Sequence, residues 1–164
     1  MDEGDVREFL DSDYRRIVMG VALVAESVEL AEDAVQEALA RAWERSERGE
    51  RIESLPGWVR IVAINLVRSG IRRRIRERRV RARLAEPPVS EPLIRSDDLV
   101  DVRRALAQLS PRQRLVTVLR YYFDLSLGEI ATMLKINEGT VKTNLFRARQ
   151  AMGRHLGDEK GAGT

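Results

Sequence analysis

Two short amphipathic helices joined by a tight turn are the pattern that narrows the possible folds of this chain furthest. They are predicted over LSLGEIATMLKINEGTVKTNLFRARQAM, residues 125–152. Ser126 with Glu129 three residues later is the capping-box pattern of a helix start. Asn137 is suited to cap the second helix, with Glu138 at the positive end of its dipole. So short a connection between two helices predicts a helix-turn-helix.

The second of these helices has two contrasting faces. Its apolar residues recur at helical spacing, as expected for a stripe packed on the first helix: Val141, Leu145, Ala148 and Met152. The opposite face is polar and cationic and carries Gly139, Lys142, Thr143, Phe146, Arg147 and Gln150. A helix with one packed face and one such polar face suits a DNA major groove. The plainer alternative is a helical hairpin with a solvated charged face.

One residue departs from the usual turn. Many such turns carry glycine just after the first helix, where the backbone needs positive φ. This chain has Lys135 there. Two outcomes are open: the turn is strained, or a neighbour such as Asn137 adopts the unusual conformation.

Composition excludes several classes of site. The 164 residues contain no Cys and a single His155, which excludes disulfides and thiolate zinc sites and argues against a histidine metal site. We therefore expect no metal and no cofactor. No apolar run approaches the roughly 20 residues of a membrane span, and the acidic start MDEGDVREFL is unlike a signal peptide. The expected location is cytoplasmic, without membrane insertion.

Charge is ordered along the chain. The net charge is −8 over residues 1–50, +9 over 51–83 and +2 over 84–164. Nine Arg and only one acid occupy residues 68–83. An acidic block beside a strongly basic one indicates two kinds of partner, a basic protein surface and a phosphate backbone.

Helical periodicity predicts an all-α fold. One helix is expected over residues 6–25 and a second over 30–47, with Gly49 as its stop. A third begins near Pro56, is apolar nearly all round and is therefore expected to be buried, and leads into the arginine run.

The prolines of residues 84–98 interrupt the helical pattern and predict a linker. Beyond it we expect a helix over 99–109, another opened by Ser110-Pro111, and the helix-turn-helix. The prediction is two small helical domains: an N-terminal one over 1–83, a linker over 84–98, a C-terminal four-helix module over 99–156, and a tail over 157–164.

Three blocks in this order resemble a known family. They are AEDAVQEALARAWER (residues 31–45), LPGWVRIVAINLVRSGIRRR (55–74) and the stretch from residue 105 to 152. The chain resembles bacterial RNA polymerase sigma factors of the extracytoplasmic-function group of the sigma-70 family. The resemblance implies a non-enzymatic factor that binds core RNA polymerase and recognises the minus-10 and minus-35 elements of promoter DNA. It also implies an anti-sigma protein as a partner.

The resemblance assigns roles to residues of the N-terminal domain. The first block implies polymerase docking through Asp33, Gln36, Glu37 and Arg41, which from pattern alone form a solvated helix edge. The second implies capture of a flipped minus-10 base by Asn65, whose amide both donates and accepts; the plainer alternative is a buried, satisfied asparagine. Trp58 is a stacking candidate, although a core role is favoured for it, and the phosphate-binding candidates are Arg68, Arg72, Arg73, Arg74 and Arg76.

The third block implies minus-35 reading by the second helix of the helix-turn-helix. Lys142, Thr143 and Arg147 are the candidates for base edges or adjacent phosphates, with Gln150 on the same face. Phe146 either meets a thymine methyl or sugar, or folds back onto the module. One departure concerns the minus-10 block: Ser69, followed by Gly70, stands where relatives commonly have Asp, which questions the local helix geometry.

Two other functions compete. A stand-alone transcriptional regulator leaves the acidic block and the arginine-rich helix unexplained. A nucleic-acid-processing enzyme lacks support, since the chain has neither a phosphate-binding glycine loop nor clustered carboxylates.

Overall fold

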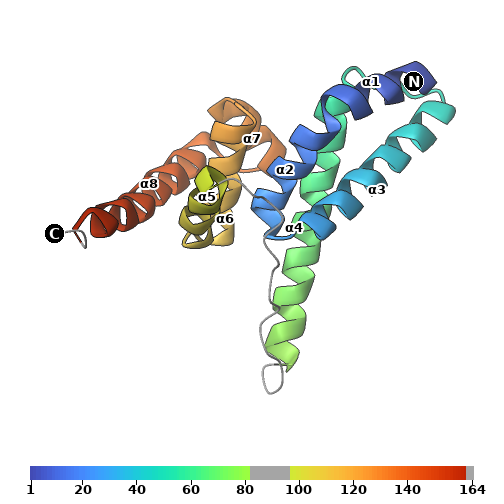
Figure 1. Cartoon of the computed structure of the whole chain (residues 1–164). Helices are drawn as coiled ribbons and strands as arrows, with labels where there is room; N and C mark the ends of the chain where they lie inside the picture. The colour runs from blue at the N-terminus through green and yellow to red at the C-terminus, as the bar shows by residue number, and fades with distance from the viewer. Residues whose placement is uncertain (82–96, 162–164) are drawn as a thin grey trace. The chain divides into compact units, whose positions relative to one another are not determined.

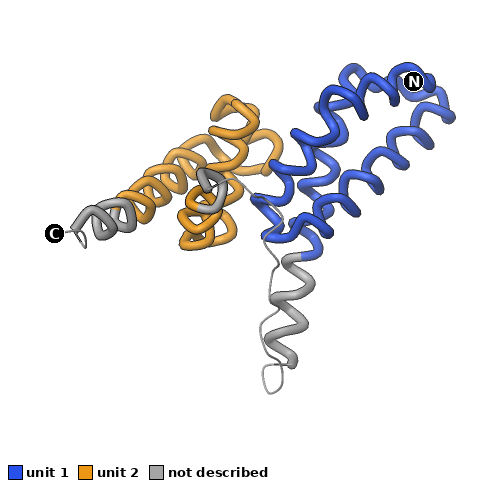
Figure 2. Tube along the Cα trace, in the orientation of Figure 1, with its two compact units in different colours: residues 1–91 blue, residues 92–164 orange. Residues whose placement is uncertain are grey.

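The computed structural model describes the backbone of residues 1–81 and 97–161 and the side chains of residues 1–70 and 101–153. All regular elements within those residues are helical (Figure 1). The chain divides into two compact units, Met1–Glu91 and Pro92–Thr164 (Figure 2). The predicted all-α fold with two helical domains is confirmed. The division falls within residues 84–98, the predicted linker, most of which lies outside the described residues.

Unit 1 is built on three helices that pack against one another: α2 (Tyr14–Ala25), α3 (Val28–Glu47) and α4 (Leu55–Arg81). A shorter helix, α1 (Glu3–Ser12), packs on α2 and α4 (Figure 1). The core is aliphatic, and its largest fully buried side chains are Val21, Val35, Val59 and Ile64. Burial of these apolar side chains is the main stabilising term in such a bundle.

Local signals fix the ends of α3 and the start of α4. The Leu30 amide donates to Ser27 Oγ at 3.2 Å, which caps α3. Beyond its end, Gly49 has a φ of +79°, which glycine adopts without steric cost. Helix α3 therefore ends just before Gly49, the residue predicted as its stop. At α4 the Gly57 amide donates to Ser54 Oγ at 3.2 Å.

The single helix predicted over residues 6–25 is wrong, because the chain bends at Asp13 into α1 and α2. Asp and Ser are weak helix formers, and they occupy residues 11–13. The bend lets α1 bury Phe9, which is 2% exposed and meets the Tyr14 ring edge to face at 6.3 Å. The break between α1 and α2 thus goes together with the packing of the Phe9 ring in the core.

The expectation that α4 is buried on nearly all sides is also wrong. Val59, Ala63, Ile64 and Val67 are buried, but Ile61 is 40% exposed and Asn65 is exposed. The buried residues recur at helical spacing and form the stripe that packs in the bundle. Ile61 and Asn65 therefore lie on a side of α4 that is open to solvent.

Unit 2 is the four-helix module that the sequence predicted. Its helices are α5 (Asp97–Ala107), α6 (Pro111–Thr117), α7 (Leu127–Leu134) and α8 (Glu138–Gly161), and α6 continues into a π-helical turn, η1 (Val118–Tyr122). Ser110 and Gln113 form a capping box at the start of α6. Helix α8 continues through the first part of the tail expected from residue 157.

A buried arginine connects α5 to α6. Arg114 is 6% exposed; its Nε donates to the Leu106 carbonyl at 2.9 Å and its Nη2 to the Leu109 carbonyl at 3.3 Å. These carbonyls belong to the end of α5 and the residues after it, where helical partners run out. Arg114 therefore satisfies backbone groups that the turn between the helices leaves open.

Within the described part of the chain, no helix is both long enough and apolar enough to cross a lipid bilayer.

Candidate nucleic-acid interface

The helix-turn-helix of α7 and α8 is formed by the predicted caps. The Glu129 amide donates to Ser126 Oγ at 3.2 Å, and the Ser126 amide donates to the Glu129 carboxylate at 2.8 Å. At the start of α8, the Thr140 amide donates to Asn137 Oδ1 at 2.7 Å. Both helix starts are thus satisfied by side chains close in sequence.

The turn between α7 and α8 places its positive φ on Lys135 itself, at φ 54° and ψ 51°. The Lys135 amide donates to the Thr132 carbonyl at 3.2 Å and the Ile136 amide to the Ala131 carbonyl at 3.0 Å. These bonds close the end of α7 as in a left-handed helix cap. The alternative that Asn137 takes the unusual conformation is wrong.

Helix α8 has the two predicted faces. Val141, Leu145 and Ala148 are buried, which locks α8 onto the module. The predicted recognition residues are all exposed: Lys142, Thr143, Phe146, Arg147 and Gln150. Phe146 is 61% exposed, so it does not fold back onto the module. The Thr143 hydroxyl donates to the Gly139 carbonyl at 2.9 Å, which leaves its oxygen free to accept.

Asn65 lies on the exposed face of α4, which contradicts the buried-asparagine alternative. Its Oδ1 accepts from Arg68 Nη1 at 3.2 Å. Two apolar neighbours on the same face, Ile61 and Val62, are exposed or half-buried. The sequence interpretation did not single them out, because in an apolar helix their exposure has no local signal. Trp58, two turns before Asn65, is half-buried.

The Ser69-Gly70 pair does not interrupt α4. Ser69 Oγ donates to the Asn65 carbonyl at 2.9 Å, four residues back along the same helix. Helix α4 continues to Arg81. The predicted phosphate-binding residues Arg72, Arg73, Arg74 and Arg76 lie in this span, but their side chains are outside the described residues.

The four predicted docking residues share one exposed edge of α3. Asp33, Gln36, Glu37 and Arg41 are all exposed, and Arg41 Nε meets Glu37 Oε1 at 2.7 Å. Asp33 and Glu37 also line a cleft of about 280 Å³ whose other walls are apolar or small: Ala25, Leu30, Ala34, Leu66, Val67 and Gly70. The docking edge therefore adjoins the helix that carries Asn65.

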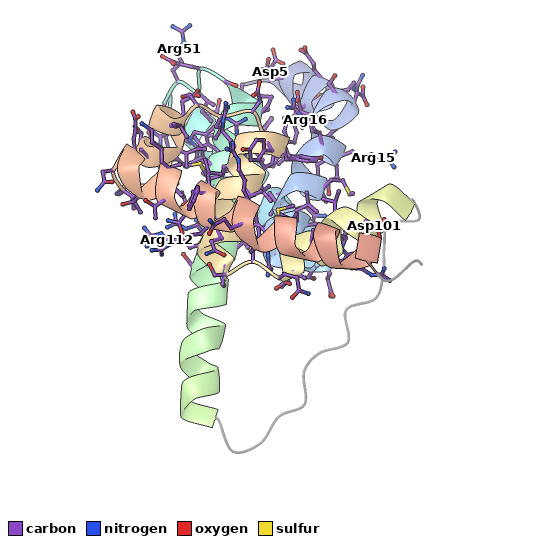
Figure 3. All side chains as sticks on the ribbon, turned by 90° about the vertical axis from the view of Figure 1, so that its left-hand side faces the viewer. Asp5, Arg15, Arg16, Arg51, Asp101 and Arg112 are labelled. Carbon is purple, nitrogen blue, oxygen red and sulfur yellow. The ribbon has the colours of Figure 1, made fainter. Side chains whose placement is uncertain are left out.

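Trp43, also on α3, is 37% exposed. Charged side chains cover both units; Asp5 of unit 1 and Arg112 of unit 2 are exposed examples (Figure 3). Among the described residues, no group of three or more His, Asp or Glu is placed to hold a metal ion.

Comparison with protein families finds two matches. Residues 10–77 match the family model described as Sigma-70 region 2, and residues 99–152 match the one described as Sigma-70, region 4. The region 2 match runs from the end of α1 through most of α4, and the region 4 match includes the helix-turn-helix. Together they cover both candidate surfaces.

Individual relatives agree with these matches. The chain is 37% identical over 128 residues to the ECF RNA polymerase sigma factor SigL of Mycobacterium tuberculosis, covering 74% of this chain and 72% of SigL. It is 35% identical over 118 residues to the RNA polymerase sigma-E factor of Streptomyces coelicolor, covering 72% and 67%. It is 30% identical over 146 residues to SigW of Bacillus subtilis, covering 80% and 78%.

A solved structure is also similar. It is the sigma factor RpoE of Bartonella quintana, in complex with the anti-sigma factor NepR. The TM-score is 0.74 at 26% identity, and the match covers 93% of this chain and 96% of that one.

Proposed function

The chain belongs to the sigma-70 family of bacterial RNA polymerase sigma factors, in its extracytoplasmic-function group, and on that premise we propose how its two units share the work. Its function is promoter recognition in transcription initiation, the first of the three functions weighed from the sequence. Sigma factors are non-enzymatic DNA-binding regulators, so we assign no catalytic step to this chain. The proposed partners are core RNA polymerase, promoter DNA and an anti-sigma protein, and the proposed location is the cytoplasm, where polymerase acts.

Unit 1 docks the polymerase and captures the minus-10 strand in this proposal. Asp33, Gln36, Glu37 and Arg41 form the docking edge. Asn65 holds an extruded base, and its exposure on α4 supports that role. Extrusion costs a few kcal/mol, which hydrogen bonds and apolar contact with the base must offset. Asn65 supplies the hydrogen bonds, and Trp58, Ile61 and Val62 beside it are suited to the apolar contact.

The arginine run completes the minus-10 surface. Arg68, Arg72, Arg73, Arg74 and Arg76 bind the phosphates that flank the captured base, because the forked guanidinium matches phosphate oxygens. Each phosphate so neutralised releases counterions, which makes binding strongly salt-dependent.

Unit 2 reads the minus-35 element through α8. The observation that carries this assignment is the exposure of all five predicted recognition residues on the face opposite the buried stripe. Arg147 is proposed to contact a base edge, since Arg pairs bidentately with guanine. Lys142 is proposed to meet a phosphate, and Phe146, free of the module, a thymine methyl or sugar.

The test is promoter selection by holoenzyme reconstituted with core polymerase on a genomic promoter library. Arg147→Ala should relax selection at one minus-35 position, at a cost of about 1–3 kcal/mol. Lys142→Ala should weaken binding evenly across sequences. Thr132→Ala, at an exposed position of α7, serves as the control. Unchanged selection and affinity in both α8 variants would remove the assignment.

A further inference from the structure

Arg149 and Tyr121 meet in unit 2 although 28 residues separate them. Arg149 Nε donates to Tyr121 Oη at 2.9 Å, and Arg149 Nη2 donates to the same oxygen. The guanidinium carbon lies 5.7 Å from the ring centroid, as expected for an approach to the hydroxyl end of the ring. Two donors on one acceptor fix the plane of the guanidinium group.

The π-helical turn η1 presents Tyr121 to this contact. The Phe123 amide donates to the Val118 carbonyl at 3.1 Å, five residues back. Val118 and Leu119 stay buried, whereas Tyr121 is 54% exposed. A π turn changes the direction of the side chains that follow it and is frequent at functional sites. Here it leaves a large aromatic side chain in solvent, held by an arginine.

Arg149 lies along one edge of the proposed recognition surface. It follows Lys142 by seven residues and Phe146 by three, so all three share one side of α8. All are exposed. This edge therefore alternates cationic and aromatic side chains, with Tyr121 beside it from the preceding element.

The hydrogen bonds to Tyr121 orient the guanidinium of Arg149. The partner is a hydroxyl, and among the described residues no carboxylate lies within ion-pair distance of Arg149. A guanidinium has five N–H donors, and the tyrosine oxygen engages two of its nitrogens. The donors on Nη1 remain for a ligand. A fixed, uncompensated guanidinium on a DNA-facing helix matches a phosphate oxygen in charge and geometry.

We propose that Arg149, positioned by the Tyr121 hydroxyl, binds one backbone phosphate at the edge of the minus-35 element. This inference rests on the proposed role of α8. Tyr121 is a positioning residue that acts through Arg149. The competing explanation is a purely structural link between η1 and α8.

Holoenzyme binding to a duplex that carries the minus-35 element and ends upstream of the minus-10 element tests the contact. Over a salt series, Arg149→Ala should weaken binding about three- to tenfold and lower the slope of log K against log salt by about 0.9. Arg104→Ala is the matched control, because it removes the same charge from an exposed arginine of unit 2 that already faces Asp101 at 3.8 Å. An Arg149→Ala slope equal to that of the wild type overturns the proposal.

Single neutral methylphosphonates along the same duplex locate the phosphate. Wild-type holoenzyme should lose affinity at each contacted phosphate, and at one such position beside the minus-35 element the methylphosphonate should not weaken binding by Arg149→Ala any further. Tyr121→Phe should weaken binding less than Arg149→Ala does. Combined with Arg149→Ala, it should cause no further loss of affinity. If binding by Arg149→Ala is as sensitive to the methylphosphonates as wild-type binding at every position, Arg149 makes no phosphate contact.

Two further readouts separate the alternatives. A purely structural link predicts that Arg149→Ala lowers both the melting temperature and the affinity for core polymerase. The phosphate contact predicts that both stay at wild-type values. A loss of both would overturn the phosphate contact. Lys142→Ala and Arg147→Ala are measured in parallel. If they weaken binding and Arg149→Ala does not, only this inference fails, whereas wild-type binding by all three also removes the minus-35 assignment.

Discussion

Among single side chains, Asn65 offers the sharpest test of minus-10 capture. It is exposed, and the hydrogen bond of its side chain to Arg68 lies within one helix turn, so Asn65→Ala should leave folding and core binding unchanged. It should reduce promoter opening about tenfold or more, because a lost base-edge contact costs about 1–3 kcal/mol. Permanganate reactivity of minus-10 thymines measures opening.

A pre-melted template distinguishes capture from unpairing. The Asn65→Ala defect should persist on a promoter with an open minus-10 bubble, since the missing contact is to the extruded base. Ser69→Ala is the control, because its hydroxyl is engaged with the backbone of its own helix. Wild-type opening of the duplex promoter and wild-type binding to the pre-melted one by Asn65→Ala would leave Asn65 without a role in capture.

Lys135 is the residue whose backbone conformation can be relieved. A left-handed conformation costs a residue with a Cβ about 1–2 kcal/mol. Glycine avoids this cost, but its greater freedom in the unfolded chain offsets part of the gain in stability. Lys135→Gly should therefore stabilise unit 2 by about 0.5–1 kcal/mol. Lys135→Ala keeps the Cβ and should give no such gain. Thermal unfolding followed by circular dichroism measures both, and equal melting temperatures would contradict the argument.

Among the helices, α4 contains a matched pair of glycines. A Cβ added at Gly70 meets nothing within 4 Å, whereas one at Gly57 meets the capping Ser54 Oγ at 3.1 Å. Gly70→Ala should stabilise unit 1 by about 0.5–1 kcal/mol through the helix propensity of alanine. Gly57→Ala should gain less or lose stability, because the cap must shift. Urea unfolding compares them; a larger gain at Gly57 would be the contrary result.

For the chain as a whole, the proposed function makes promoter recognition depend on docking to core polymerase. Reversing both acids of the docking edge, Asp33→Lys with Glu37→Lys, should weaken core binding at least tenfold while stability changes little, since exposed charges contribute little to folding. Glu44→Lys with Glu47→Lys is the control, because it makes the same charge change on exposed positions of α3. Equal core affinity for the two double variants would refute the docking edge.

The sequence predicted correctly those features that depend on residues close together in the chain, and it failed where distant residues decide. The caps at Ser126 and Asn137 were predictable because each involves residues within one helical turn. The bend at Asp13 was not, since it accompanies the burial of Phe9 against other helices. Exposure along α4 was missed because Ile61 and Val62 are as apolar as their buried neighbours. The Tyr121–Arg149 contact has no local pattern at all.

The unbroken course of α4 has a mechanical consequence. With a rise of about 1.5 Å per residue, the sixteen steps from Asn65 to Arg81 form a rod of roughly 24 Å. The cleft beside Asp33 and Glu37 is walled by the same helix, so in the proposed function the orientation of the docked bundle also sets the direction in which α4 runs.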